Sequence, residues 1–151
     1  MPHHERAWKV KRVARRVMGL LVLAALAGFL GSGPFSRRTL SHPSGLQLSF
    51  NSIVRYNAPA RLILATPPGK GRLELAINSD FIESIDLERI DPEPTQTLLE
   101  GRNHLFIFDR AESTEPSSIL IAFRPQAFGR VRARIEMRSL GNFSIQPFFL
   151  P

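Results

Sequence analysis

The 151-residue chain contains no cysteine. This absence excludes a disulfide framework, a zinc site with cysteine ligands and a cysteine nucleophile. Beyond Ser36 the sequence also lacks a convincing run with helical periodicity, and the Gly-x-Ser-x-Gly pattern of a serine hydrolase does not occur. The roughly 110 residues in this part of the chain must therefore form a domain that its hydrophobic core alone stabilises, which is feasible at that length.

Residues suited to catalysis or metal binding are few and scattered. His42 lies in a segment rich in serine, proline and glycine, and His104 begins an apolar run. The acidic residues between Asp86 and Glu93 stand beside prolines and lack the Asp-x-Asp-Gly pattern of a calcium loop. We therefore predict a protein that is not an enzyme, has no cofactor or metal, and offers no recognisable site for a small-molecule substrate.

Acidic residues are outnumbered by basic ones, 13 to 20, and the formal net charge is +7. The excess is concentrated at the N-terminus. Residues 1–16 contain six basic residues and one acidic residue, a net charge of +5, which leaves only +2 for the rest of the chain. A basic flank beside a hydrophobic stretch is typical of membrane proteins rather than of nucleic-acid-binding domains, so we expect no nucleic-acid partner.

The longest uncharged stretch runs from Val17 to Ser36 and reads VMGLLVLAALAGFLGSGPFS. Twenty residues of helix rise about 30 Å, the thickness of the hydrocarbon core of a bilayer. The basic residues before it predict a cytoplasmic N-terminus and an exported body. We therefore divide the chain into a basic cytoplasmic tail (1–16), a transmembrane helix or signal anchor (17–36), a linker (37–45) and a periplasmic domain (46–151). The expected location is a bacterial inner membrane, with the lipid bilayer as one partner.

A cleaved signal peptide is the alternative interpretation of this stretch, because Ala25-Leu26-Ala27 matches a small-x-small cleavage site before Gly28. In an uncleaved helix, Ala24, Gly28 and Ser32 are spaced four residues apart and align as a ridge of small residues. Such ridges allow membrane helices to pack closely. A helix end that frays into the linker explains the same composition equally well.

From Leu46 onward the hydrophobic period changes to two. Apolar and polar residues alternate over 46–51, 72–77 and 130–138, whereas 104–109 and 118–123 are apolar on both faces. Turn residues separate seven to nine short strands at a spacing of roughly 8–12 residues. This pattern predicts an all-β domain, an antiparallel β-sandwich with immunoglobulin-like architecture.

The alternating strand at 130–138 carries an arginine stripe on its polar side: Arg130, Arg132, Arg134 and Arg138. The stripe can be a binding patch for an acidic partner, a polyanion or lipid headgroups. It can also be a solvated strand face that pairs with acidic residues of another strand, such as Asp86 and Glu88. We expect the structural explanation, and we predict that Ile135, on the opposite side of the same strand, is buried.

The C-terminal segment is rich in phenylalanine. Adjacent residues of a strand point to opposite faces, so Phe148 and Phe149 cannot both face the core. We predict that one of them is exposed, as part of a contact surface or against the membrane. Pro147 interrupts this last strand and favours an edge position or a bulge.

The chain resembles an uncharacterised bacterial family of small single-pass inner-membrane proteins, which have a basic N-terminus, one hydrophobic anchor and a β-rich periplasmic domain with an aromatic-proline tail. The matching pieces are Gly33-Pro34-Phe35, Phe123-Arg124-Pro125 through Gly129-Arg130, and Phe148-Phe149-Leu150-Pro151. The resemblance implies an accessory partner of a larger multi-pass membrane protein, and it brings no catalytic residues.

We therefore expect a membrane-anchored, non-catalytic extracytoplasmic β-sandwich that acts as a protein-interaction module, with another membrane protein as its partner. The alternative is a cleaved periplasmic domain that binds an anionic ligand or polymer through the arginine stripe. The mass of the mature protein and its retention in membranes after a high-salt wash discriminate between the two.

Overall fold

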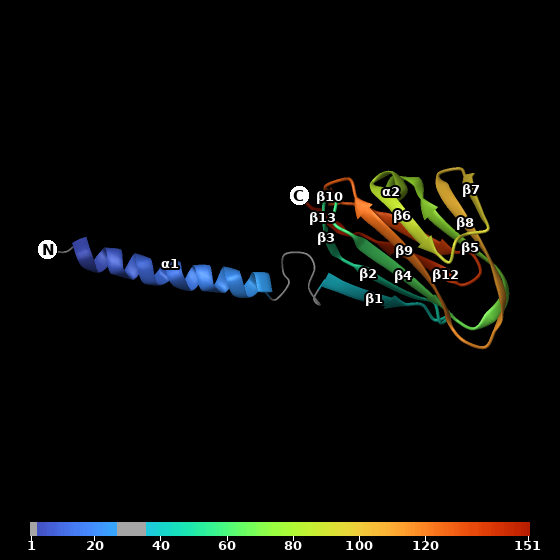
Figure 1. Ribbon diagram of the computed structural model, residues 1–151, viewed down its shortest axis with the longest axis horizontal. Coiled ribbons are helices and arrows are strands. Elements are labelled where there is room, and N and C mark those ends of the chain that lie inside the picture. Colours follow the sequence, from blue (N-terminus) through green and yellow to red (C-terminus); the bar gives the residue numbers. More distant parts are fainter. Residues whose placement is uncertain (1–2, 27–35) are drawn as a thin grey trace. The chain divides into compact units, whose positions relative to one another are not determined.

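The computed structural model describes residues 3–26 and 36–151. Side chains are described over 11–23 and, apart from Ala111 and Ser113, from Ser36 onward. The chain divides into two compact units, one that ends at Ser36 and one that runs from Arg37 to Pro151 (Figure 1). Within the described residues, the first unit contains one long helix and the second contains all of the strands.

Helix α1 extends from His3 to Leu26, so it includes the basic tail as well as the first part of the hydrophobic stretch. Alanine, leucine, lysine and arginine are frequent in its sequence, and these residues have high helix propensity. The expected boundary at residue 17 is therefore not a structural one, because a single helix continues through it. None of the helices in the described part of the chain combines the length and the apolar character needed to cross a membrane.

The second unit confirms the predicted all-β fold. Two five-stranded antiparallel sheets and a small three-stranded sheet contain its strands. The order in the first large sheet is β1 (Arg37–Ser41), β2 (Gln47–Asn51), β4 (Ala60–Thr66), β9 (Ser117–Pro125), β6 (Ile85–Asp91). The order in the second is β12 (Gly141–Ile145), β11 (Ala133–Met137), β5 (Gly69–Asn78), β8 (Asn103–Ser113), β7 (Gln96–Glu100). The small sheet contains β10 (Gly129–Arg130), β13 (Phe148–Leu150) and β3 (Ile53–Arg55), and its β13–β3 pair is parallel.

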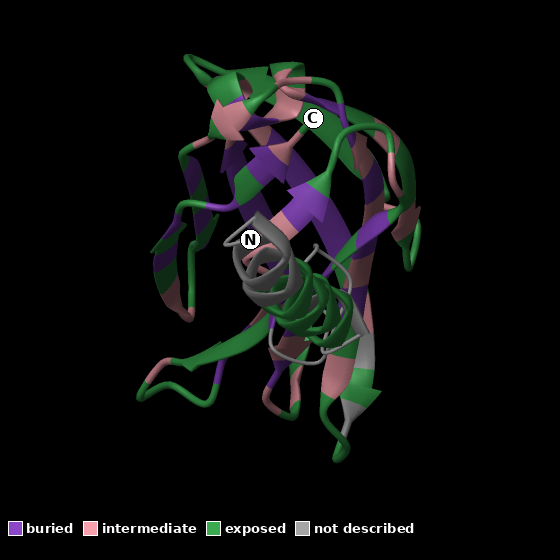
Figure 2. Ribbon diagram, turned by 90° about the vertical axis from the view of Figure 1, so that its left-hand side faces the viewer, coloured by how far each residue is buried: buried purple, intermediate pink, exposed green. Residues whose placement is uncertain are grey.

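One hydrophobic core lies between the two large sheets (Figure 2). Strands β4 and β11 alternate strictly between inward and outward residues, so Leu62 and Leu64 of one sheet belong to the same core cluster as Ile135 and Met137 of the other. Ile135 is fully buried, as predicted. Between β5 and β6 the chain forms a short helix, α2 (Ser79–Glu83), which adds its buried phenylalanine to the core.

The segment expected to be a linker, 37–45, belongs to the β unit. Arg37–Ser41 forms β1, which pairs with β2 along its whole length. A turn from His42 to Gly45 then joins the two strands, and Gly45 supplies the positive φ of 86° that this turn needs. All five residues of β1 are exposed, so its sequence has no hydrophobic alternation from which a strand can be predicted.

The strand predicted over 130–138 is two strands in different sheets. Strand β10 pairs with β13, whereas β11 pairs with β12 and β5. The side chain of Asn78 stabilises the crossing between them: its amide nitrogen donates to the Arg132 carbonyl at 3.1 Å, and its oxygen accepts from the Arg134 N–H at 2.7 Å. The final segment is divided in the same way: β12 ends at Ile145, and after Pro147 the chain enters β13 in the small sheet.

Candidate functional site

The outer face of the small sheet carries an exposed group of basic and aromatic residues. The register places Arg130 opposite Phe148 and Phe148 opposite Ile53, so these three side chains share one face. The intervening residue, Phe149, points to the other side and is fully buried, whereas Phe148 is 37% exposed. This confirms the prediction that one of the two adjacent phenylalanines is exposed.

A second aromatic pair lies beside this sheet. Tyr56 follows β3 and Phe128 precedes β10, and their rings lie against each other at a tilt of 30°, with centroids 4.7 Å apart. The Tyr56 N–H donates to the Leu150 carbonyl at 2.7 Å, and its hydroxyl donates to Gln126 at 3.3 Å. The rings are therefore held in place although they are 41% and 62% exposed.

Three arginines lie near these aromatic rings. Arg38 of β1 lines the same groove as Arg130 and Phe148, with a volume of about 500 Å³, and Arg55 ends β3 opposite Leu150. Within the described part of the chain, these arginines form no ion pair. We define the arginine–aromatic face by six residues: Arg38, Arg55, Tyr56, Phe128, Arg130 and Phe148.

A second candidate surface lies between the edge strands β6 and β7 of the two large sheets. A groove of about 690 Å³ separates them, with an apolar floor that includes Leu87, Ile90 and Phe106. All five residues of β7 are exposed, and its adjacent Leu98 and Leu99 are 51% and 67% exposed. Among the described strands, β7 pairs only with β8, so the other edge of its backbone is open to a further strand.

The acidic side of this groove is partly neutralised by neighbouring arginines. Glu88 lies at an irregularity of β6 and accepts a hydrogen bond from Arg124 of β9, and this bond and the Glu88 charge raise the pKa of the Arg124 guanidinium. Asp91 pairs with Arg89 at 3.3 Å. Glu93, by contrast, makes no ion pair within the described residues, so it leaves one uncompensated negative charge at the groove.

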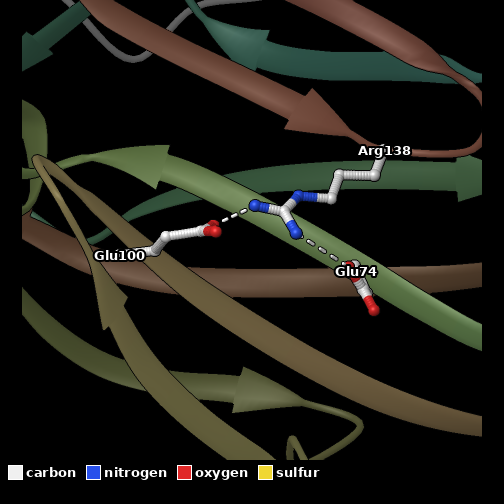
Figure 3. Close-up of polar contacts among 3 residues, drawn as sticks. All are labelled: Glu74, Glu100 and Arg138. Atoms are coloured by element: carbon white, nitrogen blue, oxygen red, sulfur yellow. Dashed lines mark hydrogen bonds and ion pairs between the residues drawn. The ribbon is translucent and has the colours of Figure 1, made fainter.

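The arginine stripe is not one continuous face, because Arg130 and Arg134 belong to different sheets. Arg138, just after β11, instead lies between the carboxylates of Glu74 on β5 and Glu100 on β7 (Figure 3). The expected pairing of the stripe with Asp86 and Glu88 does not occur, because β6 lies in the other large sheet.

The Arg138 ion pairs cross the outer face of the second large sheet. Strands β5 and β8 separate β11 from β7, so the Arg138 side chain extends over their outer face to reach Glu100. A small buried cluster lies on those two strands, formed by Ala76, Leu105 and Ile107. The ion pairs therefore lie on the outer side of a sheet whose alternate residues already face the main core.

We expect Arg138→Gln to lower the free energy of unfolding by less than about 1 kcal/mol, because the Arg138 side chain is 42% exposed and its ion pairs are screened by water. Urea unfolding at low and high salt measures the effect, and the loss should diminish at high salt. Arg134→Gln is the matched control, since Arg134 has no ion pair within the described residues. A large loss that salt does not change would mean that the aliphatic part of Arg138 stabilises the sheet by packing.

The small-residue ridge and the histidines add no further candidate site. Gly28 and Ser32 of the small-residue ridge lie outside the described residues, as does the side chain of Ala24. Among the described side chains, no three histidine, aspartate or glutamate residues converge as a metal site requires. The Nδ1 atom of His42 lies 2.9 Å from the Ser44 hydroxyl, and its ring packs edge-on against Phe143. The absence of enzyme activity stays a prediction.

Two features of these surfaces were missed from the sequence. Adjacent residues of a strand point to opposite faces, so the pair Leu98-Leu99 is itself a signal in the sequence that an edge strand here places at least one leucine in solvent. The contact of Tyr56 with Phe128 has no sequence signal, because it joins loops far apart in the chain. Comparison of the sequence with models of known protein families and with curated proteins finds no match.

Proposed function

We propose that the chain is a membrane-anchored, extracytoplasmic β-sandwich of immunoglobulin-like architecture that binds another membrane protein, through the free edge of β7 and the groove beside it. The anchor in this proposal is the uncharged stretch 17–36, and the six basic residues before it orient the N-terminus to the cytoplasm. The observation that carries the proposal is the exposure of β7, an edge strand with two leucines in solvent.

Strand addition is the recognition mode that this geometry favours. An extended segment of the partner would pair with the backbone of β7, and its alternate side chains would contact Leu99 and the apolar floor of the groove. Soluble proteins usually protect such edges with charge, proline or a short strand, and β7 presents Leu98 and Leu99 instead. Glu93 adds a preference for a partner segment with a basic residue.

Site-specific photocrosslinking in native membranes tests this proposal. A photoreactive residue at Leu99 should capture one defined membrane protein, whereas the same residue at Ile63, on β4 of the other large sheet and 37% exposed, should not. The double change Leu98→Lys and Leu99→Lys should abolish co-purification without lowering the melting temperature, and Ile63→Lys should leave it intact. Equal capture from both positions, or a partner retained by the folded double variant, would contradict the proposal.

The orientation gives a separate prediction. A C-terminal reporter that is active only in the cytoplasm should be silent, because the basic residues are concentrated before the hydrophobic stretch and only Arg37 and Arg38 follow it directly. The same reporter fused after residue 16, without that stretch, is the positive control. Activity of the C-terminal fusion would show that the orientation is reversed or that the chain is not exported.

The alternative function, a cleaved domain that binds an anion through the arginine stripe, has less support. The stripe is divided between two sheets, and Arg138 is already paired with two carboxylates. Retention in membranes after a high-salt wash, together with the mass of the mature protein, separates the two functions. A mature protein that begins at Gly28 and is released by the wash would favour the alternative.

A further inference from the structure

We propose that the arginine–aromatic face lies against the anionic surface of the membrane that anchors the chain. This inference rests on the anchoring part of the proposed function, and it concerns a surface distinct from the β6–β7 groove. The proposed binding partner of this face is the headgroup layer of a bilayer that contains anionic lipid.

The first argument is charge. Arg38, Arg55 and Arg130 lie together at the small sheet, and none of them has a carboxylate partner within the described residues. Three guanidinium groups on one end of a domain repel one another and attract anions. Anionic headgroups supply that counter-charge, and each basic side chain near such a surface contributes about 1 kcal/mol.

The second argument is the kind of apolar residue exposed there. Tyr56, Phe128 and Phe148 present aromatic rings to solvent beside the arginines, and the contact of Tyr56 with Phe128 holds two of them in place. Tyrosine is enriched at the boundary between headgroups and acyl chains. Phenylalanine is among the residues that interfacial membrane-binding helices bury at that boundary. A surface that combines rings with basic groups has the composition of an interfacial membrane-binding face.

The third argument is the length of chain available. Arg38 follows Ser36, the end of the hydrophobic stretch, by two residues. Two extended residues span at most about 7 Å, so an anchored stretch holds Arg38 close to the headgroup layer. Strands β10, β13 and β3 lie together at one end of the β unit (Figure 1). Because Arg38 lines the same groove as Arg130 and Phe148, the end of the β unit nearest the bilayer is the one that carries this face.

The experiment uses the full chain with a single introduced cysteine, which is selective because the chain has none of its own. A fluorophore is attached either at Gln146→Cys, an exposed position in the groove of the face, or at Ser139→Cys, an exposed position in the turn between β11 and β12. The labelled protein is reconstituted into vesicles of phosphatidylcholine with phosphatidylglycerol, which carry a headgroup quencher. We expect several-fold stronger quenching at position 146 than at position 139.

If the face binds anionic headgroups, the difference in quenching should depend on charge; if the face is only close to the membrane, it should not. The difference between the labels should shrink in vesicles of phosphatidylcholine alone and at high salt, since salt screens headgroup charge. It should also shrink in the triple variant Arg38→Gln, Arg55→Gln and Arg130→Gln. A variant that loses three charges elsewhere, Arg72→Gln, Arg89→Gln and Arg134→Gln, should keep it.

Two failures are distinguishable by flotation of the vesicles. If the chain does not float with them, the anchor is wrong and this inference falls with it. If the chain floats but the two labels are quenched equally, or if the difference is the same in neutral vesicles, the anchor stands and the docking of the face is overturned. Melting temperatures of both triple variants establish that the β unit is folded in each comparison.

Discussion

Ile135→Asp should abolish the folded state of the β unit. Ile135 is fully buried at the centre of β11, opposite Ile77 of β5 and Phe143 of β12. A carboxylate at this position has apolar neighbours on both sides, and an unpaired buried charge costs several kcal/mol. That cost is comparable with the whole stability of a typical domain, roughly 5–15 kcal/mol. Circular dichroism and thermal melting should show no cooperative transition.

Arg134→Ser, one residue away, is the matched control. The Arg134 side chain is exposed, and the contact that holds this part of β11 to Asn78 is made by its backbone N–H, which the substitution keeps. We expect the free energy of unfolding to change by less than about 1 kcal/mol. Equal losses for the two variants would mean that the faces of β11 are assigned wrongly.

Phe149→Ala should lower the free energy of unfolding by roughly 3–5 kcal/mol, because removing a buried phenylalanine leaves a cavity that the surroundings fill only in part. Phe149 is fully buried in the middle strand of the small sheet, between Gly129 of β10 and Val54 of β3. Its loss therefore weakens the sheet that carries the arginine–aromatic face. Urea unfolding of the full chain measures the change.

The neighbouring substitution Phe148→Ala provides the comparison. Phe148 is 37% exposed on the opposite side of the same strand, so its truncation should cost less than about 1 kcal/mol. If Phe148→Ala is as destabilising as Phe149→Ala, the exposed ring is a structural element, and its place in a binding face loses support.

The sequence alone allowed the fold class and the inward face of the alternating strands to be predicted. Alternation with a period of two is a property of neighbouring residues, so it identified β2, β5 and β11 and the burial of Ile135. The same rule required that one of Phe148 and Phe149 be exposed. It did not identify β1, because an edge strand with both faces in solvent needs no apolar residues.

Only the tertiary structure decided which strands share a sheet and which charges meet. Arg130 and Arg134 alternate in one run of sequence, but the chain changes sheets between them where Asn78, from a distant strand, holds the backbone. In the same way, Arg138 meets Glu74 and Glu100 because β11, β5, β8 and β7 are adjacent in one sheet. Pairing between distant strands depends on hydrogen bonds and core packing of the whole unit, which local periodicity does not encode. The candidate surfaces depend on that pairing, so they follow from the fold and not from the sequence pattern.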